Sequence, residues 1–125
     1  MITNSRRAAG RYAGDMDFKY FSSLAAEVTP PPDGILSRTL HDDDRLKVVL
    51  FGFSQGQQLS EHTAAVPAVL HVLEGEAVLR LGREERTAQA GAWVYMAPKL
   101  PHGILAKTPL ILLLMMLKTP AATAP

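Results

Sequence analysis

The chain has 125 residues, the size of one ordinary domain, with 47% hydrophobic and 20% charged residues. Its net charge of +1 gives no reason to expect nucleic acid or a membrane surface as a partner. Cysteine is absent, so disulfides and thiolate sites are excluded, and any metal would be held by His, carboxylate or water.

The first part of the chain predicts an N-terminal extension, residues 1–34, that is partly disordered. Residues 18–28 are expected to form a short strand and a helical turn that pack on the body. The sequence TPPPDG at 29–34 predicts a rigid connector, because proline fixes φ and Asp-Gly favours a turn. No apolar run follows the N-terminal arginines, so a secretory signal is not expected, and the protein is expected in the cytoplasm.

After Gly34 the pattern changes to short β-rich runs separated by turn residues, which is typical of an all-β sandwich or barrel. We expect a hairpin loop at 83–87, a proline-rich turn at 98–103 and a flexible tail at 119–125. The body is therefore residues 35–118, and its expected strands are 35–40, 46–53, 59–65, 68–75, 76–82, 91–97, 104–107 and 109–118.

Two of these expected strands, 46–53 and 110–117, are apolar at almost every position. A strand with one solvated face would alternate between apolar and polar residues, so both faces of these strands should be covered. A second copy of the chain is the simplest cover, which predicts a homodimer. The alternative is that the N-terminal segment covers that face within one chain. The run at 110–117 is far shorter than the roughly 20 residues of a membrane span.

Two spacings resemble the motifs of the cupin superfamily over about residues 35–117. Gly56 is followed by five residues and then His62, and Gly75 stands where the first motif closes. Gly91 opens the second motif, and His102 closes it. The resemblance is to a small single-domain cupin of the type-2 conserved-barrel kind, and it implies a double-stranded β-helix, or jelly-roll barrel.

Two of the departures from these motifs fall on residues that bind metal in the family. The second His of the first motif is replaced by Ala64, and the Glu by Ala68 or, with the longer spacing, Val69. The Gly of the second motif is replaced by Lys99, and its Pro by Ala97. Metal-binding cupins hold a divalent ion with three His and one Glu, so this chain keeps only half of that set.

The resemblance makes His62 and His102 the candidate metal ligands. It implies one divalent transition metal ion (Zn, Fe, Ni or Mn), weakly held, because zinc sites usually have three or four protein ligands. Period 2 along a strand should place His62 and Ala64 on the barrel side, with His102 facing them. Two other interpretations stay open: a small-ligand pocket without metal, and a pair of satisfied core histidines.

The other titratable candidates favour structural interpretations. His71 has the opposite parity to Ala68 and is expected to face away from the cavity, as a core or interface histidine. His41 lies among aspartates in an expected turn, where solvent explains it. Glu74 and Glu76 flank Gly75 and are expected to be surface charges.

Three functions are compatible with this pattern. The first is a small-molecule binding or sensing module with a degenerate metal site, which the missing ligands favour. The second is a metal-dependent enzyme of dioxygenase or isomerase type, with two histidines plus water as its ligand set. The third is a role like that of sugar-nucleotide epimerases, which would need an acid and a base near a nucleotide cleft, and no set of Lys or Arg residues in the barrel-facing strands supports it. The sequence names no catalytic residue and no substrate.

Overall fold

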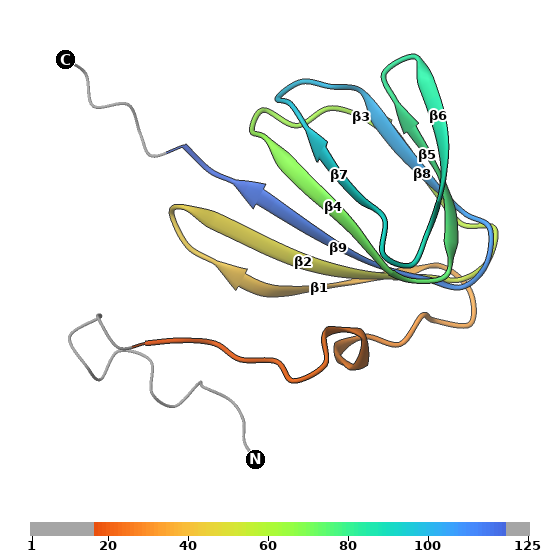
Figure 1. Ribbon diagram of the computed structural model, residues 1–125. Helices are drawn as coiled ribbons and strands as arrows, with labels where there is room; N and C mark the ends of the chain where they lie inside the picture. The colour runs from red at the N-terminus through yellow and green to blue at the C-terminus, as the bar shows by residue number, and fades with distance from the viewer. Residues whose placement is uncertain (1–16, 120–125) are drawn as a thin grey trace.

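The computed structural model describes residues 17–119. Its strands form two antiparallel sheets that face each other (Figure 1), one of five strands in the order β1-β2-β9-β4-β7 and one of four in the order β3-β8-β5-β6. This is the all-β, double-stranded β-helix that the sequence predicts. The strand bounds are β1 Ile35–Asp42, β2 Leu46–Phe53, β3 Gln58–His62, β4 Ala68–Glu74, β5 Glu76–Leu81, β6 Glu84–Gln89, β7 Trp93–Met96, β8 His102–Ala106 and β9 Leu110–Leu117.

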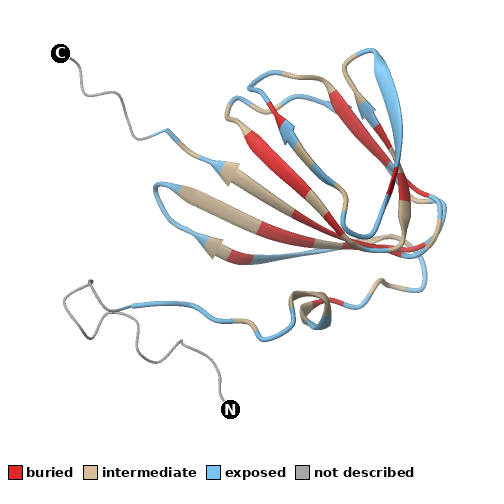
Figure 2. Ribbon diagram, viewed as in Figure 1, coloured by how far each residue is buried: buried red, intermediate tan, exposed pale blue. Residues whose placement is uncertain are grey.

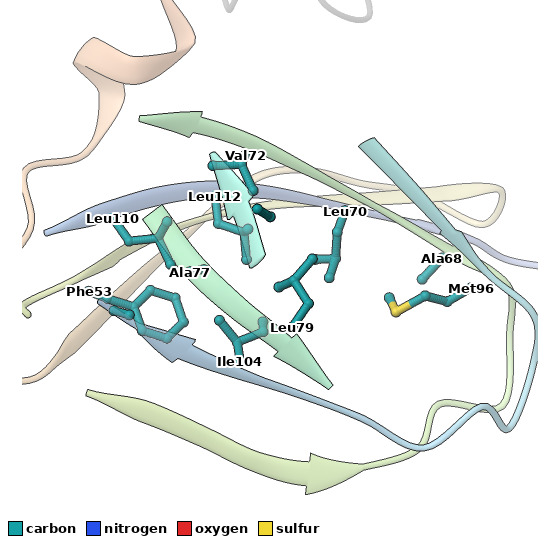
Figure 3. Close-up of a cluster of buried hydrophobic side chains, with 12 residues drawn as sticks. Phe53, Ala68, Leu70, Val72, Ala77, Leu79, Met96, Ile104, Leu110 and Leu112 are labelled. Atoms are coloured by element: carbon teal, nitrogen blue, oxygen red, sulfur yellow. The ribbon is translucent and has the colours of Figure 1, made fainter. Parts of the chain in front are cut away.

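The main core lies between the two sheets and follows the strand alternation. Every second residue of β4 and β9 enters it, together with apolar residues of β2, β5, β7 and β8 (Figure 3). Phe53, Leu79 and Leu112 are almost completely buried there. The interior of the barrel is therefore filled with side chains, as packing at crystal-like density requires.

A second core lies on the outer face of the five-stranded sheet. The segment of residues 17–34, here called the strap, runs beneath β1 (Figure 1) and contains the 3₁₀ helix η2, Leu24–Glu27. Its side chains Phe21, Leu24, Ala25 and Val28 pack on the outward residues of β1, β2 and β9. The strap therefore covers the outer faces of β2 and β9 within one chain, which was the alternative to a second copy for these strands.

Close backbone contacts and an ion pair attach the strap to the barrel. A Cβ on Gly52 would lie 3.0 Å from Pro30 Cα, so the polyproline turn rests directly on β2. Arg38 forms a 2.9 Å ion pair with Glu27. Lys19 donates to the carbonyl of Leu40 at 3.2 Å.

Three sequence predictions are wrong in detail. Residues 83–87 are not a hairpin loop, because β6 begins at Glu84 and only Gly82 and Arg83 form the turn. The described part of the extension, 17–34, contains η2 but no strand. Strand β1 continues through His41 to Asp42. The expectation of disorder for residues 1–16 lies outside the described residues. No helix in the described part of the chain is long and apolar enough to cross a membrane.

Candidate functional site

The two candidate histidines lie side by side on neighbouring strands. His62 is the last residue of β3 and His102 the first of β8, and the two residues are paired in the antiparallel register. The centroids of their rings are 4.3 Å apart, and the ring planes are tilted by 58°. On its other side His102 is paired with Leu81 of β5. The structure thus brings together the two sequence positions, 40 residues apart, that the motifs single out.

A bulge in β3 places His62 on the barrel side of the sheet. Leu59 pairs with Ile104 and His62 with His102, so β3 uses one more residue than β8 between these pairs. Ser60 and Glu61 both lie opposite Gly103. The extra residue places His62 on the same face of the sheet as Leu59 and Ile104. Without the bulge, strict alternation from Leu59 would turn Glu61 inward and His62 outward.

Gly103 makes the close approach of this bulge to β8 feasible. A Cβ at position 103 would lie 3.1 Å from the carbonyl oxygen of Leu59 and 3.4 Å from the backbone nitrogen of Glu61. Both atoms belong to the backbone of β3, so the clash could not be relieved by the rotation of a flexible side chain. The absence of a side chain at 103 therefore supports the geometry of the histidine pair.

Both imidazoles are oriented by the same local contact. Nδ1 of His62 lies 2.9 Å from the carbonyl oxygen of Ser60, and Nδ1 of His102 lies 2.9 Å from that of Leu100. A carbonyl oxygen can only accept, so each Nδ1 donates its proton. In a neutral imidazole the other nitrogen, Nε2, then carries a lone pair. The site consequently offers two Nε2 atoms as hydrogen-bond acceptors or metal ligands, each with its ring orientation fixed from behind.

The pair sits at one end of the barrel, with one ring covered and one open. His102 is only 6% exposed, whereas His62 is exposed. The loops after β3 and β7 meet beside the pair, where Lys99 donates its backbone N–H to the carbonyl of Ala64 at 2.7 Å. Lys99 has a φ of 70°, a left-handed conformation that favours glycine, and the second motif has glycine at that position. Strand β3 ends before Ala64, so strand alternation does not set the direction of this residue.

Apolar side chains occupy the position where the family has its carboxylate. Ala68 begins β4, is 2% exposed and pairs with Met96 of β7, which is 1% exposed. Both lie in the main core, at the end of the barrel where β3 ends and β8 begins (Figure 3). Within residues 17–119 no three His, Cys, Asp or Glu side chains cluster as a metal site would need. The two imidazoles therefore fit a metal only as half of a ligand set.

The other titratable candidates lie away from the pair. His71 falls between Val69 and Leu73 on the outer face of β4, opposite to the core-facing Leu70 and Val72, as its parity predicts. Glu76 forms a 3.8 Å ion pair with Lys107 and is a surface charge.

His41 belongs to the charged hairpin between β1 and β2 and is not simply solvated. Its Nε2 lies 2.7 Å from Oδ2 of Asp43. The other oxygen of Asp43 accepts the backbone N–H groups of Arg45 and Leu46, both at 2.8 Å. The Arg45 N–H first, then His41 and the Leu46 N–H, hold the pKa of Asp43 well below its usual range. These contacts close the hairpin and give Asp43 a structural role.

The arrangement of the two sheets, with a histidine pair at one end, defines a small cupin-fold barrel. No protein-family model matches the sequence, and a comparison with curated proteins finds no match. Among solved structures, a conserved protein of unknown function from Streptococcus pyogenes is similar, with a TM-score of 0.76 and 26% identity over 85% of this chain and 93% of the other. A cupin superfamily protein from Desulfitobacterium hafniense has a TM-score of 0.74 and 24% identity, over 77% and 88% of the two chains. An RmlC-like cupin from Desulfovibrio desulfuricans has a TM-score of 0.71 and 27% identity, over 80% and 96%. The chain has the cupin fold, as the two motifs predict, and these relatives name no activity for it.

Proposed function

We propose that this cupin-fold protein is a small-molecule binding module whose ligand is anchored by the paired Nε2 atoms of His62 and His102. The observation that supports it most directly is the matching contact of both Nδ1 atoms, each 2.9 Å from a backbone carbonyl oxygen. Two neighbouring lone pairs call for a ligand that accepts electron density. A divalent transition metal ion or a small molecule with hydrogen-bond donors meets that requirement.

A metal ion would be held by these two imidazoles and by water. Bound there, it would supply Lewis-acid chemistry to whatever reaches the open side of the site. The chain's own contribution is to fix both rings and to shield His102, which is buried, from solvent. Affinity should be modest because two protein ligands and the charge of a carboxylate are missing compared with a full site.

A metal-dependent enzyme with this reduced ligand set is the second candidate. The exposure of His62 favours it, because a ligand bound there remains accessible to water and substrate. Both candidates leave water on a bound metal ion, so the fate of a bound compound separates them. A compound converted by the metal-loaded protein supports the enzyme, whereas a compound recovered unchanged supports the binding module.

Titration of the untagged protein with Zn²⁺ and Ni²⁺, in competition with a coloured chelator, tests the proposal. We expect one saturable site, with His62→Ala and His102→Ala each weakening it at least about tenfold, since losing even an outer-shell partner typically costs that much. The Nε2 resonances of the two rings should shift when metal is added, while both Nδ1 atoms stay protonated.

The chain contains its own matched controls, because it has four histidines and two of them lie outside the pair. His41→Ala and His71→Ala should leave the titration unchanged. If these variants weaken binding as much as His62→Ala, the metal is bound elsewhere. If the wild type binds neither ion, and the ring resonances do not respond, a metal role for the pair is excluded.

A further inference from the structure

A groove lies on the outer face of the four-stranded sheet, across β3 and β8 from the histidine pair. The sheet is at the upper right of Figure 1, and the strap lies on the opposite side of the molecule. The volume of the groove is about 280 Å³, just below the roughly 300–1,000 Å³ of typical ligand pockets, so it suits a small ligand. We call it the outer groove, and the main side chains that line it are Gln58, Glu61, Val78, Arg80, Glu85 and Leu105.

Gly103 makes this surface concave. The residues on either side of it, His102 and Ile104, are buried on the barrel side, so position 103 faces outward. Across the sheet Gly103 lies between Glu61 of β3 and Arg80 of β5. Because position 103 has no side chain, an open space separates these two charged residues.

The floor beside this space is apolar. Val78 and Leu105 pair directly across β5 and β8. Val78 is half-buried and Leu105 is 37% exposed, so both present apolar surface to the groove. Gln58 of β3 pairs with Leu105 on the other side and adds a polar group at the edge of the floor.

The charges that line the outer groove are unbalanced. The guanidinium of Arg80 forms a 2.8 Å ion pair with Glu85, which neutralises both groups. Among the side chains that the structure describes, none forms an ion pair or a side-chain hydrogen bond with Glu61. The groove therefore offers one carboxylate without a counter-charge, next to an apolar floor.

We propose that the outer groove binds a small organic cation, an ammonium group on a short apolar stem. The ammonium donates to the carboxylate of Glu61 and to the side-chain oxygen of Gln58, and the stem lies on Val78 and Leu105. An anion is disfavoured, because Glu85 already occupies the guanidinium of the groove and Glu61 repels negative charge. This site is independent of the histidine pair, which lies on the other face of the sheet.

Nuclear magnetic resonance titration with benzylamine tests the proposal. A chelator is present so that no metal ion can link the amine to the histidines. The amide resonances of Glu61, Val78, Gly103 and Leu105 should shift and saturate, while the ring resonances of the histidine pair stay in place. Benzyl alcohol has the same ring without the charge and should bind roughly fivefold more weakly, the upper end of what an exposed ion pair contributes. Benzoate should not bind, and added salt should weaken the binding of benzylamine.

Glu61→Gln should reduce the affinity for benzylamine to about that for benzyl alcohol, and Glu61→Lys should abolish binding. Both changes are at an exposed side chain, so the fold should persist by circular dichroism. Glu84→Gln is the matched control, because Glu84 is an exposed glutamate of β6 (pale blue in Figure 2) that does not line the groove. It changes the net charge equally and should keep the wild-type affinity.

Any of five results would overturn the proposal. The first is that benzylamine causes no saturable shifts at tens of millimolar. The second is that benzyl alcohol binds as tightly as benzylamine, or that Glu61→Gln leaves the affinity unchanged. The third is that the shifts fall on the histidine rings instead of the groove. The fourth is that benzylamine binds only after removal of residues 1–16, which would make that segment the occupant. The fifth is that the groove resonances change with protein concentration, which would make a second copy the occupant.

Discussion

Substituting Gly103 by alanine should separate the two histidine rings without changing either histidine. The added Cβ would lie 3.1 Å from the carbonyl oxygen of Leu59, and atoms of this kind are rarely closer than about 3.4 Å. The bulge of β3 would have to move away by a few tenths of an ångström. Since the same bulge turns His62 inward, its displacement should be transmitted to the ring pair.

Two opposing terms set the size of the effect on stability. Overpacking of this kind typically costs about 1–3 kcal/mol. Replacing glycine by alanine gives back about 0.4–1 kcal/mol, because the unfolded chain loses conformational freedom and the φ of Gly103 is not in the left-handed region. The steric term is larger, so urea unfolding should show a net loss of roughly 1–2 kcal/mol.

The decisive measurement is the nuclear Overhauser effect between the ring protons of His62 and His102. Centroids 4.3 Å apart should give clear cross-peaks in the wild type, and Gly103→Ala should weaken them. Gly52→Ala is a matched control, because its Cβ would lie 3.0 Å from Pro30 and displace the strap instead. It should lower stability and leave the ring cross-peaks intact. Unchanged cross-peaks in Gly103→Ala, with a stability loss below about 0.5 kcal/mol, would refute the role assigned to the bulge.

Three further changes test other parts of the structure. Lys99→Gly should raise the free energy of unfolding by about 0.5–1 kcal/mol, because it removes a side chain from a left-handed backbone conformation. The urea midpoint should rise accordingly, and a lower midpoint would show that the φ of residue 99 does not determine the effect. The depressed pKa of Asp43 means that its carboxylate stabilises the fold above the unfolded value of about 4 and that this contribution is lost as pH falls through the folded value. Asp43→Asn should therefore flatten the fall in urea midpoint between pH 5 and pH 2, and an unchanged slope in this variant would contradict the assignment. Ala68→Glu should cost several kcal/mol at pH 7 because it buries an unpaired carboxylate, and Zn²⁺ should recover part of the loss in thermal midpoint. No response of that variant to Zn²⁺ would mean that position 68 does not point to the histidines.

The fold could be predicted from the sequence because its motifs carry conformational requirements as well as chemistry. Gly75 illustrates this, with a φ of 92° and a Cβ that would lie 2.2 Å from the carbonyl oxygen of Pro109. Such positions tolerate little besides glycine, so the motif spacing survives even where ligands are lost. Strand β6 was missed for the opposite reason. Its residues Glu84, Glu85 and Arg86 are exposed at a sheet edge, where charged side chains prevent pairing with another chain. The same charges remove the apolar/polar alternation by which a strand is recognised in a sequence.

The histidine pair was only partly predictable. The spacing places His62 and His102 in their motifs, but simple alternation extends the strand through Ala64, whereas β3 ends at His62. The bulge that orients His62 depends on contact with Gly103 on another strand, 41 positions further along the chain. Tertiary contacts of this kind leave no local pattern. The strap differs, because the strands 46–53 and 110–117 are apolar on both faces and therefore predict a cover, although the sequence leaves a second copy and the N-terminal segment as alternatives.

The packed interior decides where along the barrel a ligand can bind. Phe53, Leu79 and Met96 are at most 1% exposed, so the inside of the barrel is occupied by the protein itself. A carboxylate at position 68 would have to displace this packing, and the alanine there belongs to the core as much as to a lost site. The two histidines, by contrast, lie at the end of the barrel, and the ring of His62 reaches solvent. A ligand anchored by their Nε2 atoms, as we propose, would therefore bind at the mouth and approach from the side of His62. Its affinity would depend on the positions of the two imidazoles and on the loops that meet between Ala64 and Lys99.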